Sequence, residues 1–484
     1  MSLQGVVPLV LEFLPHKPIV VEVADSRLTG DAGVLAIRQF DEAIRLTERF
    51  AAVLTDQRVG EVEHTLLSMV RQRMYGILAG YEDQNDHDVL RGDPAFQLVC
   101  DRIPGEGELA SQPTLSRFEN AVSIADLWRL RDALCTEFLD AFSAPPARMT
   151  LDMDAFDDPT HGRQQLTFFH GYYDQYQYLP NVITCAETDM VALIQLRHGT
   201  CAAWLGVDDD LRYLARRIRE RFPNVEIVVR GDCGFGVPLM SEVCEELRLT
   251  HTFGLAMISR LKAESKELLA QAVQQFEETG QKQRLFLKLE YQADSWTQPR
   301  RVVIKCEAHD EGTNVRAVST NRPGWSIHPQ GVYDESTERG ESENRNKELK
   351  RELSADRLSD HRFVANFFRL YLHSAALNLL VRLRRATARE PLPREESSTA
   401  NALPADLPRE ALPEPSRRAF FQRRRQHDPL GEGFACTWRQ RLIKCAAEIV
   451  VSARRILVRL ASHWPFTHEY HRIAAAALAH PRSP

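Results

Sequence analysis

The sequence predicts an α/β protein that has a sheet of mixed strand direction and a preceding domain of helices. Two observations lead to this prediction. Apolar residues recur at three- and four-residue spacing up to about residue 147, which is typical of amphipathic helices. From residue 148, short apolar runs follow one another as strands do, and helix and strand patterns then alternate. Such an order favours a mixed sheet with helices packed on it.

The first 147 residues hold several segments with helical periodicity. A helix-turn-helix reader of DNA and a packing or dimerisation module both show this pattern, and periodicity does not separate them. The segments are DAGVLAIRQFDEAIRLTERFAAVL, HTLLSMVRQRMYGILAGY, ASQPTLSRFENAV with its Ser-x-Pro start, and ADLWRLRDALCTEFLDAF.

The next part of the chain supplies the predicted sheet. Strands are expected in ARMTLDMDAF, QQLTFFHGYY, PNVITCAE, MVALIQLRHG, NVEIVVRGD and LTHTFGLAM, and helices in LRYLARRIRERF and VPLMSEVCEELRL. Asp232 then follows the carboxyl end of a central strand. Open α/β sheets place their ligand sites at such strand ends.

Residues 259 to 330 interrupt this alternation with a helix, KAESKELLAQAVQQFEE, and three strand patterns, RLFLKLEY, RRVVIKCEAH and NVRAVSTN. We interpret them as a β-rich insertion. A charged helix follows, then a long apolar helix, FVANFFRLYLHSAALNLLVRLRR. Residues 386 to 418 carry six prolines and are interpreted as a linker, and a basic helical segment closes the chain.

The net charge of −6 averages over opposed segments. Between Arg417 and Arg459, eleven Lys and Arg stand against three Asp and Glu, and Leu211 to Phe222 holds five Arg against one Glu. Each run forms either a surface that binds a polyanion or a helix face that is simply exposed to solvent.

Nine cysteines are scattered without a C-x-x-C pair, which excludes a disulfide framework or zinc site of the usual spacing and suits a reducing cytosol. The N-terminus lacks the pattern of a signal peptide, and no apolar stretch predicts a membrane span. We therefore expect a cytoplasmic protein without a membrane partner.

Three acidic residues stand where a metal-dependent nucleic-acid enzyme needs them. Asp154 and Asp232 each follow a short apolar run that is typical of a buried strand, and Glu343 lies in the later charged helix. Hard divalent cations take oxygen ligands and bind phosphate oxygens. If the fold brings the three carboxylates together, they suit a pair of such cations and in-line attack on a phosphodiester.

The charged helix places several polar residues on one stripe. Arg339, Glu343, Asn346 and Lys350 are spaced by four, three and four residues. Glu343 can bind a metal while the basic residues meet phosphates. Exposed ion pairs, each contributing about 0.3–0.5 kcal/mol, would give the same pattern, and only the upstream aspartates favour the functional interpretation.

Asp152 is an alternative first ligand, because strand alternation puts it on the same face as Asp154. Asp157 and Asp158 are expected to serve the following turn. Cys233, beside Asp232, is expected to be a small buried side chain rather than a nucleophile. Trp296 and Trp325 are candidates for stacking on an unpaired base, although packing is the preferred role of each.

The order Asp154, Asp232, Glu343, with R-x(3)-E-x(6)-K at Arg339, Glu343 and Lys350, resembles the DDE transposases of bacterial insertion sequences. The chain is most similar to the thirteen-eighty insertion-sequence family (transposase DDE domain, group 1). The resemblance extends from about residue 20 to 465. It is carried by RQRMYGILAGYEDQNDHDVLRGDPAF, DDPTHG, HGYYDQYQYLP, RGDCGF and ERGESENRNKELK.

The resemblance implies a ribonuclease H-like core with a β-rich insertion, and two Mg²⁺ ions, with Mn²⁺ as an alternative. It further implies that Arg339 and Lys350 contact terminal phosphates. Two positions depart from the family. Ser336 stands where the signature has Tyr, with Tyr333 three residues too early, and Asn346 replaces a usually apolar residue.

We therefore expect a cut-and-paste DNA transposase that binds double-stranded DNA, terminal inverted repeats and target DNA, as a homodimer in the DNA complex. A stand-alone ribonuclease H-like nuclease and a decayed or domesticated DNA-binding protein are the alternatives. The expected division is a DNA-binding domain (1–147), a split catalytic core (148–258 and 331–385), the insertion (259–330), the linker (386–418) and the basic C-terminal segment (419–484).

Overall fold

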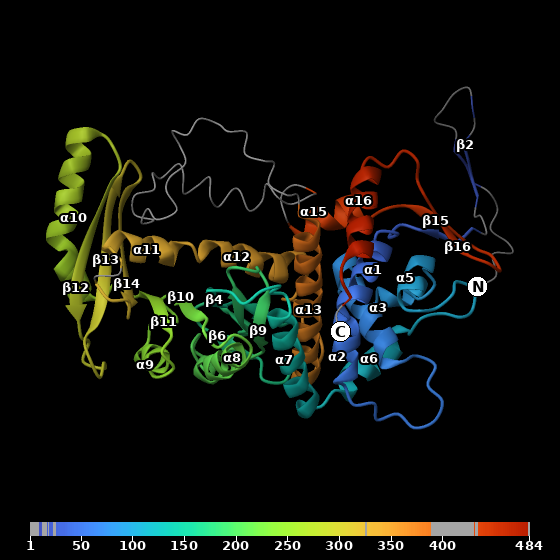
Figure 1. The fold of residues 1–484 in the computed structure, drawn as a ribbon, viewed down its shortest axis with the longest axis horizontal. Helices are drawn as coiled ribbons and strands as arrows, with labels where there is room; N and C mark the ends of the chain where they lie inside the picture. The colour runs from blue at the N-terminus through green and yellow to red at the C-terminus, as the bar shows by residue number, and fades with distance from the viewer. Residues whose placement is uncertain are drawn as a thin grey trace.

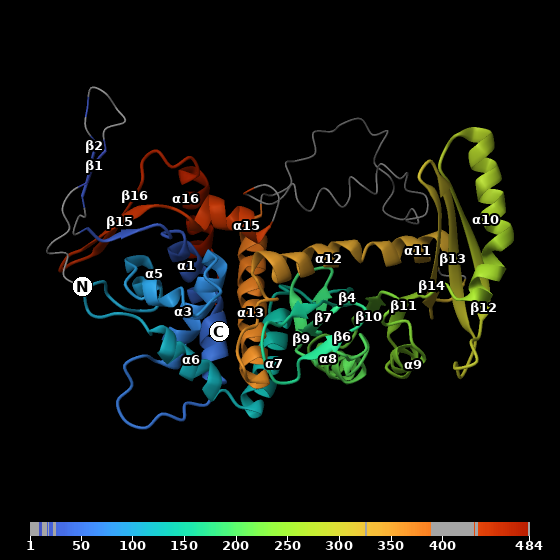
Figure 2. The same cartoon turned by 180° about the vertical axis from the view of Figure 1, so that it is seen from behind.

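The computed structural model describes residues 9–11, 17, 19–22, 26–324, 327–388, 430 and 434–482. They form an elongated mixed α/β molecule around one large sheet, with a helical module at one end (Figures 1 and 2). The predicted class, a mixed sheet with helices packed on it, is confirmed.

The large sheet has eight strands in the order β12-β13-β14-β11-β10-β4-β8-β9. Strand β10 pairs in parallel with β4 and β11, and every other neighbouring pair is antiparallel. The strands span Arg148–Ala155 (β4), Asn181–Cys185 (β8), Val191–Gln195 (β9), Glu226–Gly231 (β10), Thr250–Leu255 (β11), Gln283–Tyr291 (β12), Arg300–His309 (β13) and Gly312–Thr320 (β14).

The three predicted strands of the insertion are present, and they extend the large sheet. Strand β14 pairs with β11, so the sheet continues without a break. Strand β13 is buried on both faces. Val302 and Ile304 pack with α10 (Ser259–Thr279), and Val303 packs with α11 (Pro329–Thr337).

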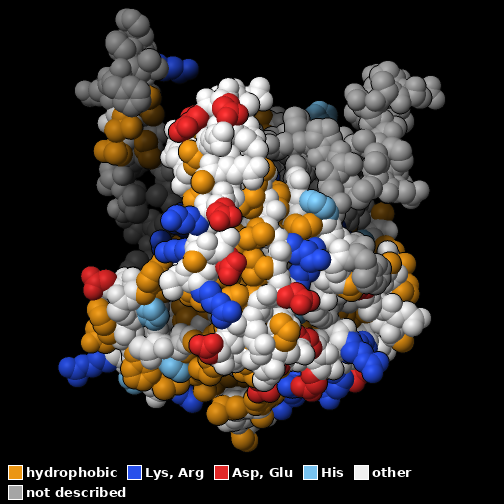
Figure 3. All heavy atoms as spheres, turned by 90° about the vertical axis from the view of Figure 1, so that its left-hand side faces the viewer, with side chains coloured by type: hydrophobic (Ala, Val, Ile, Leu, Met, Phe, Trp, Pro, Cys, Tyr) orange, Lys and Arg blue, Asp and Glu red, His pale blue; other side chains and the backbone are white. Residues whose placement is uncertain are grey.

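The end of the molecule formed by α10 and β12–β14 carries charges of both signs, mixed with apolar side chains (Figure 3). On α10, Lys262 and Lys266 alternate with Glu264 and Glu267, and all four are exposed. This mixture is not the one-sign surface expected of a phosphate track.

Helices cover both faces of the strands that carry the predicted acids. Helices α8 (Val207–Arg221) and α9 (Pro238–Glu246) lie on one side, and α11 and α12 (Gly340–Lys347) cross the other (Figure 1). Helix α12 continues into a π-helical turn, η1 (Glu348–Glu352). Along β4, alternation sends Leu151 and Met153 into the apolar core and the aspartates toward α12.

Helix α13 (Phe363–Thr387) stands between the sheet and the helical module. It contacts β9 and α7 (Ile124–Leu139) on one side, and α3 (Leu66–Ala79) and α6 (Gln112–Ala121) on the other. Its length and composition match those of a membrane span, but 89% of the apolar window is buried inside the protein. We therefore assign it to the core.

The predicted N-terminal helices are confirmed. Helix α3 begins after Thr65, whose side chain accepts a hydrogen bond from the Ser68 amide, and α7 begins with a capping box between Ser123 and Asp126. The remaining helices of the module are α1 (Val34–Ile44), α2 (Leu46–Ala52), α4 (His87–Leu90) and α5 (Pro94–Val99).

The C-terminal segment differs from the all-helical prediction. Besides α15 (Ala435–Trp438), the π-helical turn η3 (Arg439–Ile443) and α16 (Thr467–Ala479), it contains β15 (Ala447–Val451) and β16 (Ile456–Leu460). Strand β15 also pairs with β3 (Leu28–Thr29). The runs AEIVV and ILVRL are short and rich in β-branched residues, so the pairing of strands outweighs the helical tendency of their neighbours.

The QQLTFFHGYY strand also differs from the prediction, since it is not part of the large sheet. It forms β6 (Phe168–His170), which pairs with β7 (Gln175–Tyr178) in a small sheet with β5 (Asp158–Pro159). A separate pair, β1 (Leu9–Leu11) and β2 (Ile19–Val21), lies near the N-terminus. The β6–β7 hairpin is tied to the segment that follows β4, because Gln175 donates a hydrogen bond to Asp157.

Candidate active site

Asp154 lies at the end of β4 and is held by three donors. Its own strand contributes the Ala155 amide, at 2.9 Å from Oδ1, and α12 contributes Asn346, at 2.8 Å from Oδ2. The Arg339 guanidinium lies 3.4 Å from the same Oδ2. Burial raises the pKa of Asp154, while Arg339 lowers it and the charge of Asp232 raises it. The charge of Asp232 therefore acts on Asp154, the first predicted acid.

Asp232 lies in the turn that directly follows β10. Its Oδ1 accepts a hydrogen bond of 2.8 Å from the Gly234 amide. The turn packs so closely on β11 that a Cβ on Gly236 would lie 2.1 Å from the Gly254 carbonyl oxygen. The glycines of RGDCGFG therefore allow a turn that holds Asp232 at the carboxyl end of β10. The expectation that Cys233 is buried is wrong, because this residue is exposed in the same turn.

Glu343 lies on α12, and its side chain is about half exposed (46%). Arg339, one turn earlier, donates to its Oε1 at 2.8 Å. The same guanidinium contacts Asp154, so one cationic side chain bridges two of the three predicted acids. Carboxylates from a strand end and a helix, far apart in the sequence, meet at this point.

The stripe on the charged helix faces the Asp154–Asp157 segment along its whole length. Asn346 is almost fully buried and contacts Asp154, and Lys350 of η1 forms an ion pair with Asp157. Burial raises the pKa of Asp157, but the hydrogen bond and charge of Lys350 together with the hydrogen bond from Gln175 outweigh it, so the net pKa is lowered. Gln175 of the β6–β7 hairpin donates to the same carboxylate at 3.1 Å.

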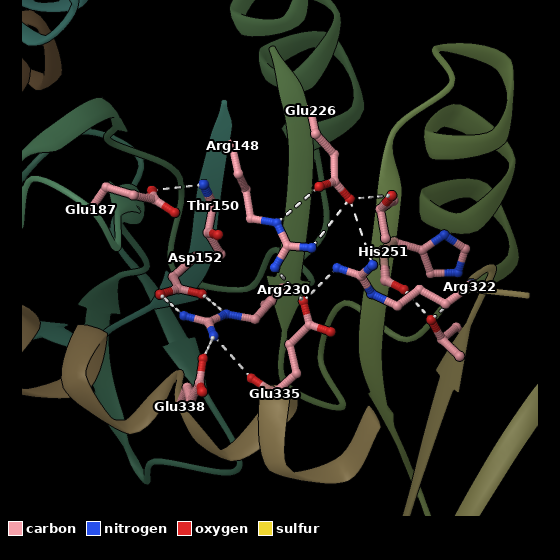
Figure 4. A network of polar contacts seen from close by, with 12 residues as sticks. Arg148, Thr150, Asp152, Glu187, Glu226, Arg230, His251, Arg322, Glu335 and Glu338 are labelled. Carbon is pink, nitrogen blue, oxygen red and sulfur yellow. Dashed lines mark hydrogen bonds and ion pairs between the residues drawn. The ribbon is translucent and has the colours of Figure 1, made fainter. Parts of the chain in front are cut away.

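Asp152 is engaged elsewhere. Both of its oxygens accept from Arg230 of β10, at 2.6 and 2.8 Å, in a buried two-point ion pair (Figure 4). Burial raises the pKa of Asp152, and Arg230 acts against that rise. The geometry therefore favours Asp154 over Asp152 as the acid available to a ligand.

Arg230 also fixes the approach of the helices. It donates to the Glu335 carbonyl at 2.9 Å and contacts Glu338 at 3.2 Å. Figure 4 shows the network continuing across the sheet through Arg148, Glu226 and Arg322 to the Glu335 carboxylate. Sequence reasoning missed Arg230, although an Arg within the apolar run IVVRGD was a signal for a buried partner.

The other predicted residues lie apart from the carboxylates or outside the described part of the chain. Trp296, between β12 and β13, packs edge-on against Tyr291, with Arg300 over its ring. Trp325 lies outside the described residues. Tyr333 is buried against Phe286 in the α11 interface, and Ser336, at the family's Tyr position, is only partly buried. Asp158, expected in a turn, is buried in β5.

The chemistry of the three acids suits a hard divalent cation, because they offer only carboxylate oxygens. Arg339 already places a positive charge between Asp154 and Glu343, so this position favours a cation. Among the described residues, however, no three acidic, His or Cys side chains are grouped closely enough to hold a metal ion as they stand.

The family model described as "Transposase DDE domain group 1" matches residues 11–400. No curated protein matches the sequence. Among solved structures, the chain is similar to a cryo-EM structure of the piggyBac transposase synaptic complex with hairpin DNA, with 12% identity and a TM-score of 0.38. That match covers 74% of this chain and 75% of the other, and its TM-score is too low to support conclusions about residues.

Proposed function

Because the chain belongs to the transposase DDE domain group 1 family, we propose that it moves an insertion sequence by cut-and-paste DNA transposition. As a DDE transposase it belongs to a class of nucleases and strand transferases that act on DNA. The observation that supports a working site is the bridge of Arg339 between Asp154 and Glu343, with Asp232 near enough to raise the pKa of Asp154. We assign the catalytic role to these three acids.

The finer assignments follow the resemblance to the thirteen-eighty insertion-sequence family. A ribonuclease H-like core would comprise β9, β8, β4, β10 and β11, with α12 carrying the third acid. Strands β12–β14 and α10 would be the β-rich insertion. The helices before β4 and the exposed arginines of the C-terminal segment would bind DNA.

DDE transposases generally use divalent metal ions, and we propose that Asp154, Asp232 and Glu343 hold Mg²⁺. Two such ions, when bound, would stabilise the attacking and leaving oxygens of phosphodiester displacement. The protein's own residues position the acids and the phosphates. Asn346 orients Asp154, the glycine turn holds Asp232, and Arg339 and Lys350 supply positive charge for the phosphates next to the scissile bond.

The proposed partners are double-stranded DNA with terminal inverted repeats and a target DNA. Cutting both ends of one element needs two active sites, which a homodimer on the DNA would supply. We place the protein in the cytoplasm, where the chromosome of a bacterial host is accessible.

A strand-joining assay tests the proposal. Full-length protein is incubated with Mg²⁺, a supercoiled plasmid, and DNA fragments that carry the inverted repeats flanking the gene. A transposase joins the 3′ ends of the fragments to the plasmid. Cleavage without joined product would indicate the alternative, a stand-alone nuclease, and binding without cleavage would indicate a decayed DNA-binding protein.

A further inference from the structure

The β6–β7 hairpin presents a group of exposed aromatic rings. Tyr172 and Tyr173 form its tip, with 85% and 38% of their surfaces exposed, and Phe169 and Tyr176 lie across its two strands. Large apolar side chains gathered on an exposed surface commonly mark an interaction site. None of the roles assigned above uses these rings.

The tip is held in a defined conformation. The amides of Tyr173 and Asp174 both donate to the His170 carbonyl, at 3.1 and 2.9 Å, and Asp174 has a positive φ of 53°. The Tyr172 amide also contacts Nδ1 of His170 at 3.3 Å. The two tyrosine rings are therefore displayed by an ordered turn. They meet edge to face, with centroids 5.0 Å apart, which leaves ring surface available for stacking.

The hairpin is linked to the proposed active site. Gln175, at the start of β7, donates to Asp157, and Asp157 is also paired with Lys350. Burial raises the pKa of Tyr173, and the charges of Asp157, Tyr172, Asp154 and Asp232 raise it further. The tip therefore lies within the electrostatic reach of two of the proposed catalytic acids.

We propose that Tyr172 and Tyr173 form a stacking platform for an unpaired base of the nucleotide next to the phosphodiester held at Asp154, Asp232 and Glu343. The proposal rests on the proposed function and names a further part of the same site. An aromatic ring stacks on any base, because every base has a π-face, whereas a paired base keeps its faces inside the duplex.

A nucleotide suits this surface better than a protein partner does. The proposed metal ions would outweigh the charges of Asp154, Asp232 and Glu343, and Lys350 offsets the charge of Asp157 beside the hairpin. A phosphate would be attracted there while its base reaches the rings. Trp296, by contrast, already contacts Tyr291 edge-on and has Arg300 over its ring.

Fluorescence of 2-aminopurine, placed in a short unpaired end of a duplex, tests the platform, because stacking on a ring quenches it. Full-length protein is compared with Tyr172→Ala and Tyr172→Phe, with Ca²⁺ present to prevent cleavage. Ile258→Ala is the control, since Ile258 is an exposed apolar residue (47%) at the start of α10, on another element. A fully paired duplex of the same sequence is measured in parallel.

We expect quenching with the wild type and Tyr172→Phe, and its loss with Tyr172→Ala. Affinity for the unpaired end should fall about tenfold in the alanine variant, while affinity for the paired duplex stays unchanged. A Tyr172→Ala protein that quenches like the wild type would overturn the proposal. So would an equal loss of affinity for both duplexes, which would indicate a general contact.

The proposed function is separable from this result. A protein that joins strands but shows no Tyr172-dependent quenching is a transposase without this platform. Quenching that depends on Tyr172 in a protein that joins no strands would keep the platform and remove the proposed reaction. Thermal unfolding of Tyr172→Ala should match the wild type, because the side chain is almost fully exposed.

Discussion

Asn346 of α12 donates a hydrogen bond of 2.8 Å to Asp154 at the end of β4, across 192 positions of sequence. Asn346 is almost fully buried, so the contact is shielded from water and holds the helix over the strand end. In this protein the amide orients the carboxylate that we propose as the first metal ligand.

Arg339 is predicted to compete with the metal ion. Replacing it by Gln removes the positive charge between Asp154 and Glu343, so the affinity for Mn²⁺ without DNA should rise roughly tenfold, while DNA affinity falls. Electron paramagnetic resonance of free Mn²⁺ measures the first effect. Arg216→Gln, an exposed arginine on α8, is the control. An unchanged Mn²⁺ affinity would show that Arg339 does not compete with the metal ion for these carboxylates.

The Arg230–Asp152 pair is predicted to be structural. Arg230→Met leaves a buried carboxylate without its partner and should lower the free energy of unfolding by about 3–5 kcal/mol. The double variant with Asp152→Leu should recover part of that stability. Urea unfolding measures both, and Arg459→Met, from an exposed pair with Glu448, should change stability by less than about 1 kcal/mol. Equal destabilisation at Arg230 and Arg459 would contradict the structural role.

Asp210 on α8 is predicted to give the protein a pH-dependent stability. Burial, opposed by Arg131 and Arg197, raises the pKa of Asp210 from 3.8 to about 7. Its contribution to stability is therefore complete below about pH 4 and disappears as the pH rises through about 7. Asp210→Asn should flatten the fall in melting temperature across this range. If the melting temperatures of the wild type and the variant fall in parallel with pH, a group other than Asp210 causes the pH dependence.

The C-terminal arginines are predicted to bind phosphates. Arg454 and Arg455 are exposed in the turn between β15 and β16, so Gln at both should weaken DNA binding. The slope of log K on log salt should become shallower by about 0.9 for each phosphate that the variant no longer neutralises. Lys262→Gln with Lys266→Gln, on the mixed-charge face of α10, is the control. Identical slopes for all proteins would exclude this surface from the DNA path.

Substitution is a sharper test here than truncation near Arg385. Removing the C-terminal segment would also remove α16, which packs on α1 and α13, and β15, which pairs with β3. Arg423 to Arg425, which belong to the basic run between Arg417 and Arg459, lie outside the described residues.

Local patterns predicted the elements that carry the site. An apolar run that ends in an acid placed Asp154 and Asp232 at strand ends, and helical spacing placed Arg339, Glu343 and Asn346 on one stripe. Both inferences depend only on the periods of strand and helix. The structure adds the contact between the strand and the helix, in which Arg339 bridges Asp154 and Glu343.

Pairing between distant segments was not predictable from those periods. The join of β14 to β11 and of β15 to β3, the latter linking Ala447 with Thr29, depends on tertiary packing. The choice between Asp152 and Asp154 likewise depended on Arg230, which binds one of two acids that the sequence leaves equivalent.

The most direct measurement compares DNA binding and cleavage by Asp232→Asn and Glu343→Gln. Both changes keep the side-chain shape and remove the charge that a metal ion needs, so gel shifts should match the wild type while Mg²⁺-dependent cleavage is abolished. Asp310→Asn and Glu264→Gln, at exposed positions, should cut normally. Cleavage by either active-site variant within a few-fold of the wild type would contradict the assignment of these acids to catalysis.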